Sequence, residues 1–139
     1  MKLFTFWRRW LLVASIGFAL NGLAVCWWPD SPHLDVWNAA IRETFGSEGE
    51  DVRRFLLGPL GGTMAGYFAM QTFIVWIPFR RRERWAWTAV ISALLTWFVS
   101  DTLASLRAGA VFNIWMVNVP ALIAAGIPLL ATRPAFRRE

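Results

Sequence analysis

The polar side chains that could do chemistry in this sequence are few, and most of them interrupt long apolar runs. Asp101 follows a long uncharged stretch and is the only acid within the apolar segments. Asn21, Asn113 and Asn118 lie inside other apolar segments, and Arg107 follows Asp101 by six residues. Polar groups in such segments are costly to bury in lipid, so we expect them to face other helices or water.

Two interpretations of Asp101 follow from its neighbours. It can form a cap or an ion pair with Arg107 that closes a turn between two helices, or it can form one wall of a shallow, outward-facing pocket with the asparagines. Asn113 and Asn118 are five positions apart, which corresponds to about 140° around an α-helix. This separation argues against both side chains pointing at one small site, so we favour the first interpretation.

The cysteine and histidine counts exclude several kinds of site. Cys26 is the only cysteine, which excludes an intrachain disulfide, a CxxC redox pair and a cysteine zinc site. His33 is the only histidine, so two histidines of one chain cannot ligate a haem. No nucleophile–base pair, histidine-rich metal set or glycine-rich phosphate loop is visible, so we expect no catalytic residues, no metal and no cofactor.

The elements that must position these side chains are four long apolar segments. Hydrophobic residues make up 57% of the 139 residues and charged residues 17%. About 20 apolar residues span the roughly 30 Å hydrocarbon core of a bilayer. The segments predict membrane-crossing helices at about 10–28, 55–78, 85–103 and 110–130. We therefore expect an all-α fold, a four-transmembrane-helix bundle that forms a single domain over residues 1–139.

The connection between the first two segments predicts an additional helix at about 32–45. Ser31 is a good N-cap, and a proline at position 32 suits the first helical position. Apolar residues then recur at spacings of three and four, at Leu34, Trp37, Ile41 and Phe45. We expect an amphipathic helix in the outer loop, on the membrane surface or on the bundle, with a lid or partner-binding role as the alternative.

Small residues form two stripes at helical spacing. In the second apolar segment, glycines recur every four residues, and glycine lets helices approach closely in a bilayer; these are Gly58, Gly62 and Gly66. In the third segment, small hydroxyl residues recur at the same spacing; these are Thr88, Ser92, Thr96 and Ser100. We expect both stripes to pack against other helices of the bundle. The alternatives are a homodimer interface for the glycines and a polar conduit for the hydroxyls.

The basic residues are distributed unevenly over the two sides that four crossings define. One side has ten of the fourteen lysines and arginines: Lys2, Arg8, Arg9, Arg80, Arg81, Arg82, Arg84, Arg133, Arg137 and Arg138. Because lysine and arginine stay in the cytoplasm, we expect a multi-pass protein of the bacterial inner membrane with both termini cytoplasmic. The asparagines and Asp101 then fall in the outer half of the bilayer, at about 1.5 Å per residue. Arginines that flank apolar runs are membrane anchors, so we expect no nucleic-acid partner.

Residues 78–132 contain a further set of motifs: Glu83-Arg84-Trp85-Ala86-Trp87, Trp97-Phe98, Asp101, Ser105-Leu106, Gly109, Asn113, Asn118 and Ile127-Pro128-Leu129. In these motifs the chain resembles small bacterial four-helix integral membrane proteins to which no activity is assigned. The resemblance implies a four-helix fold in a membrane, and it implies no functional residue.

Three kinds of function are compatible with this pattern. The leading hypothesis is a structural or interaction protein, an accessory subunit of a membrane complex, whose partners are the lipid bilayer and either other subunits or further copies of the chain. The second is a small oligomeric transporter or channel, although such proteins usually place an ionisable residue near mid-membrane, where this chain has none. The third is a membrane enzyme that acts on a lipid at the outer interface, with Asp101 as its acid or base.

Overall fold

The computed structural model describes residues 2–136, and over this range the chain is helical and contains no strand. Six α-helices follow one another within it: α1 (Lys2–Trp27), α2 (Asp35–Phe45), α3 (Glu50–Trp76), α4 (Arg84–Arg107), α5 (Val111–Asn113) and α6 (Val119–Thr132). A π-helix, η2 (Ile114–Asn118), joins α5 to α6, and there are two short 3-10 helices, η1 (Pro32–Leu34) and η3 (Arg133–Phe136). The prediction of an all-helical chain is confirmed.

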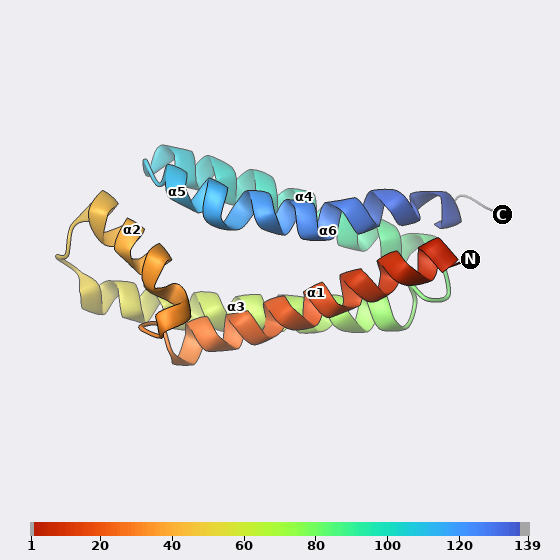
Figure 1. Ribbon diagram of the computed structural model, residues 1–139, viewed down its shortest axis with the longest axis horizontal. Coiled ribbons are helices and arrows are strands. Elements are labelled where there is room, and N and C mark those ends of the chain that lie inside the picture. Colours follow the sequence, from red (N-terminus) through yellow and green to blue (C-terminus); the bar gives the residue numbers. More distant parts are fainter. Residues whose placement is uncertain (1, 137–139) are drawn as a thin grey trace.

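The long helices form two antiparallel hairpins (Figure 1). The first pairs α1 with α3, and the second pairs α4 with the continuous run of α5, η2 and α6. The start of α1, the end of α6 and the turn between α3 and α4 lie at one end of the molecule, which we call the terminal end. The helix α2 and the turn between α4 and α5 lie at the opposite end, which we call the loop end.

Three helical segments are long and apolar enough to cross a membrane: Lys2–Trp27, Arg84–Arg107 and Val111–Phe136. Helices of this length and composition are typical of an integral membrane protein, since about 20 apolar residues suffice for a crossing. The helix α3 is equally long, at 27 residues, but it is not among the three. Its four glycines, Pro59 and Gln71 interrupt its apolar sequence and lower its mean hydropathy.

Two glycines determine how closely α1 and α3 approach each other. A Cβ atom on Gly22 would lie 2.6 Å from the backbone nitrogen of Ala65, and one on Gly61 would lie 2.5 Å from the carbonyl oxygen of Gly22. Neither position has room for a side chain. The two backbones therefore meet directly, which is how helices associate in lipid when apolar side chains gain nothing over lipid tails.

The glycine stripe predicted from the sequence lies on a different face of α3. A Cβ atom on Gly58, Gly62 or Gly66 would have nothing within 4 Å. The expectation that these glycines pack inside the bundle is therefore wrong. The face that contacts α1 passes through Gly61, one residue or about 100° away around the helix. The stripe itself stays open on the outside of the molecule.

A buried polar contact crosses the first hairpin. Gln71 on α3 donates a hydrogen bond of 2.9 Å from Nε2 to Oγ of Ser15 on α1, and this hydroxyl donates one of 2.7 Å to the carbonyl oxygen of Leu11. Gln71 is 5% exposed and Ser15 is fully buried. Because a shifted register would leave both groups unpaired, the contact helps to fix how α1 and α3 align.

The two hairpins meet at the terminal end in one apolar core. All the long helices contribute to it, with Leu11 from α1, Val75 from α3, Leu94 from α4 and Leu129 from α6 among its buried members. The side chain of Phe79, from the turn after α3, is fully buried in the same core. The hairpins are therefore joined at this end by apolar packing.

Trp10 adds a polar link between the hairpins. Pro128 has no N–H, so the carbonyl oxygen of Ala124, four residues earlier, lacks its usual helical partner. Trp10 donates a hydrogen bond of 3.0 Å from Nε1 to this oxygen. The indole of α1 thus satisfies a carbonyl of α6 that the proline leaves without its helical partner.

A smaller apolar cluster closes the loop end of the first hairpin. Leu34 packs there with Val25 of α1 and Leu57 of α3, and Trp37 of α2 lies against them. Phe45, the last member of the apolar face expected for this segment, is 53% exposed. The apolar cluster does not include Phe45, because Phe45 lies in the last turn of α2, where the chain turns away at Gly46 with φ of 79°.

Candidate functional site

The polar residues of the second hairpin converge on Asp101 of α4. Its Oδ1 atom accepts hydrogen bonds from Asn113 Nδ2 at 2.8 Å, from Asn118 Nδ2 at 3.0 Å and from Ser105 Oγ at 3.1 Å. Asn113 Nδ2 also lies 3.0 Å from Ser105 Oγ and donates to it. One carboxylate oxygen thus joins α4 to α5 and η2, and Asp101, Asn113 and Asn118 form a single site, which we call the Asp101 cluster.

The expectation that Asn113 and Asn118 cannot reach one site is wrong, and the π-helix explains why. The estimate of 140° assumed α-helical geometry between them. In η2 the N–H of Val119 bonds to the carbonyl oxygen of Ile114, five residues earlier. Residues five apart then lie nearly above one another, so both carboxamides face α4. Single π-turns of this kind occur frequently at functional sites.

The position of the π-helix is explained by Pro120. A proline in a helix removes the hydrogen bond to the carbonyl four residues earlier, here that of Met116. The widened turn Ile114–Asn118 ends just before this proline, where the regular bonding pattern cannot be maintained. The sequence therefore predicts a disturbance of the helix here. In the structure, this disturbance is a helical turn that contains one extra residue.

Arg107 and Asn21 do not belong to the cluster. Arg107 is exposed at the end of α4, and none of the ion pairs formed by residues 2–136 includes Asp101. The expected ion pair between Asp101 and Arg107 is therefore wrong, and the asparagines close the hairpin in its place. Asn21 lies on α1 and makes none of the hydrogen bonds of the cluster.

Asn118 is the most deeply buried member of the cluster. It is fully buried, and its Nδ2 also donates a hydrogen bond of 3.1 Å to Thr102 Oγ1. Its Oδ1 atom is buried without a hydrogen-bond partner among the described residues. Trp37 of α2 donates from Nε1 to Asn113 Oδ1 at 3.2 Å, which connects the cluster to the first hairpin.

An open groove of about 680 Å³ runs from Asp101 along α4. Tyr67 of α3 lines its far side, and Ser92, Thr96 and Ser100 line it on α4 together with Trp97. These hydroxyl residues are exposed, as is Thr88 nearer the start of α4. The expectation that this stripe packs against other helices of the bundle is therefore wrong, because α3 and α4 make little contact with each other.

The hydroxyl that contacts the carboxylate of the Asp101 cluster is already engaged within the cluster. Ser105 donates this hydrogen bond to Asp101 and accepts one from Asn113, and it is 7% exposed. A substrate cannot reach that oxygen without breaking the cluster. Within residues 2–136, no three His, Cys, Asp or Glu side chains lie close enough to hold a metal ion.

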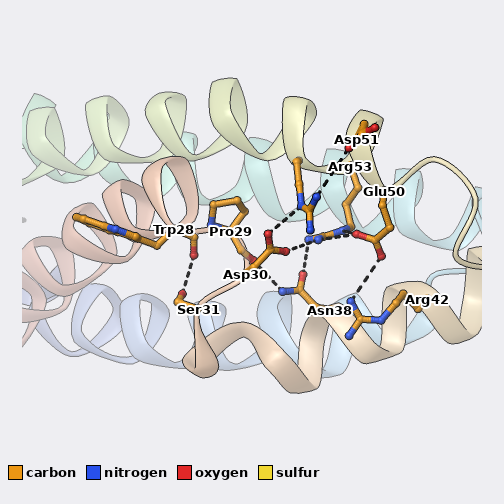
Figure 2. A network of polar contacts seen from close by, with 10 residues as sticks. Trp28, Pro29, Asp30, Ser31, Asn38, Arg42, Glu50, Asp51 and Arg53 are labelled. Carbon is orange, nitrogen blue, oxygen red and sulfur yellow. Dashed lines mark hydrogen bonds and ion pairs between the residues drawn. The ribbon is translucent and has the colours of Figure 1, made fainter.

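A second polar network, centred on Arg53, lies at the loop end (Figure 2). Arg53 donates to Asp30 Oδ1 at 2.6 Å, to Asn38 Oδ1 at 2.7 Å and from Nε to Glu50 Oε2 at 2.8 Å. Asn38 is 1% exposed and donates from Nδ2 to the carbonyl oxygen of Pro29 at 2.8 Å. The Arg53 network therefore binds the α1–α2 connection, α2 and the start of α3 to one another.

Electrostatics in the Arg53 network favour ionised carboxylates. The hydrogen bond from Arg53 lowers the pKa of Asp30 below its ordinary value, and Arg54 lowers it further, against a smaller opposing effect of desolvation. The pKa of Glu50 is lowered by the same guanidinium, with a contribution from Arg42 at 3.5 Å. The network is therefore held together by charge at neutral pH.

Sequence reasoning missed the Arg53 network, although part of its signal is visible. Glu50 and Arg53 are three residues apart, a spacing at which helical side chains meet. Asp30 and Asn38 come from separate elements, and nothing local in the sequence predicts that they approach Arg53. Buried Gln71 of the first hairpin was missed for the same reason.

Comparison with known protein families, with characterised proteins and with solved structures gives no match for this chain.

Proposed function

We propose that this chain is a structural subunit of the bacterial inner membrane, which crosses the bilayer four times and binds a transmembrane helix of another subunit. The observation on which the binding role rests is the open glycine face of α3, formed by Gly58, Gly62 and Gly66. Glycine faces promote close helix association in lipid, and the Gly22–Gly61 contact is an example within this chain.

The pairing of α3 with α1 supports a fourth crossing. The two helices lie side by side along most of their length (Figure 1), and buried contacts at Gly61 and Gln71 join them. At 27 residues α3 is about 40 Å long, which exceeds the roughly 30 Å hydrocarbon core. A helix that packs along a membrane-crossing neighbour must lie at the same depth as that neighbour.

The distribution of charges supports an orientation with the termini in the cytoplasm. Lys2, Arg8 and Arg9 begin α1 at the terminal end, where the arginine-rich turn between α3 and α4 also lies. At the loop end, Arg53 and Arg54 are paired with acidic side chains. The uncompensated positive charge is thus concentrated at the terminal end, and such charge stays cytoplasmic.

The helix α2 then lies at the outer surface of the membrane as an amphipathic helix. Trp37 of α2 and Leu34 of the preceding η1 pack toward the bundle, while Val36 of α2 is 73% exposed. In this position α2 covers the loop end of the first hairpin. The hydrogen bond from Trp37 of α2 to Asn113 links this end to the second hairpin.

Photo-crosslinking in native membranes tests the binding role. Phe73 is seven residues after Gly66, on the same face of α3, and is 59% exposed. A photoreactive phenylalanine analogue at this position should yield a protein adduct larger than the 15.8 kDa chain. Gly62→Leu should abolish the adduct, because a branched side chain keeps the partner backbone away.

The same analogue at Trp115, which is 67% exposed on η2, serves as the matched control and should yield little protein adduct. An adduct of twice the mass of the chain identifies the partner as a second copy. Crosslinking of Phe73 to lipid alone, or equal protein adducts at both positions, contradicts the proposed role.

A further inference from the structure

The groove beside α4 ends at a carboxylate that has no cationic partner among residues 2–136. Oδ1 of Asp101 accepts three hydrogen bonds, all from neutral groups. None of the described side chains donates to Oδ2. Asp101 lines the groove and is partly exposed, so an incoming cation can reach it. Charges inside membrane-crossing segments are normally paired, which indicates that a ligand supplies the missing cation.

The remaining walls of the groove suit a hydrocarbon chain. Trp97 and Tyr67 contribute aromatic surface, and Ser92, Thr96 and Ser100 are small. A groove with short side chains on its floor and aromatic rings along it can receive a flexible chain without displacing a helix.

The length of the groove matches one leaflet of a bilayer. Asp101 and Ser92 are nine residues apart on α4, which corresponds to about 14 Å along the helix axis. Half of a hydrocarbon core of roughly 30 Å is about 15 Å. When Ser92 lies near the middle of the membrane, the carboxylate therefore lies just inside the edge of the hydrocarbon core, within reach of a lipid headgroup.

We propose that the groove binds one acyl chain of a phospholipid from the leaflet at the loop end, with the primary ammonium group of the lipid paired to Asp101. Charge complementarity selects a headgroup that bears a cation and N–H donors, as in phosphatidylethanolamine. Trp97, one turn before Asp101, adds an aromatic ring near that cation. This inference is independent of the glycine face, which lies on α3.

Lipid titration of the detergent-solubilised chain, followed by native mass spectrometry, tests the proposal. Phosphatidylethanolamine and phosphatidylglycerol are added separately at equal concentrations. We expect the ethanolamine lipid to bind about tenfold more tightly, the size of effect that one hydrogen bond to a charged group provides. This comparison uses the unmodified chain and does not depend on the folding of any variant.

Three variants locate the site. Asp101→Asn retains an oxygen that accepts from Asn113 and Asn118, and it should lose the preference for ethanolamine. Thr96→Trp fills the groove and should weaken binding of both lipids. Thr88→Trp lies on the same stripe of α4 but outside the groove, and it should bind like the unmodified chain.

Equal binding of the two lipids by the unmodified chain overturns the proposal. A preference for ethanolamine that survives Asp101→Asn overturns it as well. A dimer that Thr96→Trp dissociates without loss of lipid shows that a second copy occupies the groove instead. Crosslinking at Phe73 reports on α3, whereas lipid binding reports on the groove along α4. A failure to crosslink at Phe73 therefore does not change the interpretation of the lipid titration.

Discussion

At the scale of single residues, one oxygen atom joins the polar side chains of the second hairpin near the loop end. Oδ1 of Asp101 accepts from a side chain of its own helix and from two carboxamides of the facing helix. A hydrogen bond to a charged group contributes about 1.5–3 kcal/mol, roughly twice the contribution of a neutral one. The acid and the asparagines therefore have a structural role that requires no ion pair, and Arg107 is left at the surface.

The first prediction concerns Arg53, whose side chain is 9% exposed. Arg53→Met removes the donor to buried Asn38 Oδ1, and an unsatisfied buried acceptor costs about 1–3 kcal/mol. Thermal unfolding in detergent, followed by circular dichroism, should show a clearly lower midpoint. Arg54→Met is the matched control, because Arg54 pairs with the same Asp30 but is 52% exposed. Equal midpoints for the two variants contradict the prediction.

The pH dependence of unfolding gives the Arg53 prediction a second measurement. The pKa values of Asp30 and Glu50 are lowered in the folded state. Their stabilising contribution is therefore complete above the unfolded-state values, about 3.9 for aspartate and 4.3 for glutamate, and is lost as the pH falls through the folded-state values. The unmodified chain should lose stability below about pH 4. Arg53→Met should show a flatter profile, since both carboxyls then lose the largest interaction that lowers their pKa values and retain only Arg54 beside Asp30 and Arg42 beside Glu50.

At the scale of elements, the second hairpin shows how one inserted residue rearranges a site. The sequence places Asn113 and Asn118 on different sides of an ideal α-helix, and the π-turn brings them to the same side. Pro120 indicates from the sequence that the helix is disturbed. The form of this disturbance, a π-turn, depends on the hydrogen-bond donors that Asp101 of the opposite helix requires. Local sequence alone therefore cannot predict it.

The second prediction contrasts two adjacent glycines of α3. Gly61→Ala places a methyl group against the backbone of α1 at Gly22 and Cys26, and such overpacking costs about 1–3 kcal/mol. Gly62→Ala meets open space and gains up to about 1 kcal/mol of helix propensity. Thermal unfolding of the two variants should therefore shift in opposite directions. Destabilisation by Gly62→Ala, with Gly61→Ala neutral, would reverse the assignment of the two faces.

At the scale of the whole molecule, the two hairpins are joined unequally along their length. One apolar core connects them at the terminal end, whereas at the loop end the Trp37–Asn113 hydrogen bond connects them beside an open groove. The sequence predicts the helical fold and the apolar helices because those depend on composition and periodicity. It cannot predict which face of α3 meets α1, because Gly61 and Gly62 differ only in the partner that each one faces.

The number of crossings decides the orientation of the second hairpin. If α3 crosses the membrane, the turn after it returns to the side of the N-terminus, and the C-terminus ends on that side as well. If only α1, α4 and α6 cross, the turn after α3 stays on the far side and the C-terminus ends there too. The two topologies therefore place the C-terminus on opposite sides of the membrane.

The third prediction uses a reporter enzyme that is active only in the periplasm. Under four crossings, a fusion after Gly46 should be active, and fusions after Arg81 and after Glu139 should be silent. The buried Ser15–Gln71 contact favours this outcome, because α3 outside the hydrocarbon core would have to break that hydrogen bond and the packing at Gly61. Three crossings predict activity for all three fusions, since the turn after α3 and the C-terminus then lie with α2 on the outer side. Strong activity after Glu139 would therefore refute the four-crossing topology, and the fusion after Arg81 identifies α3 as the helix that fails to cross.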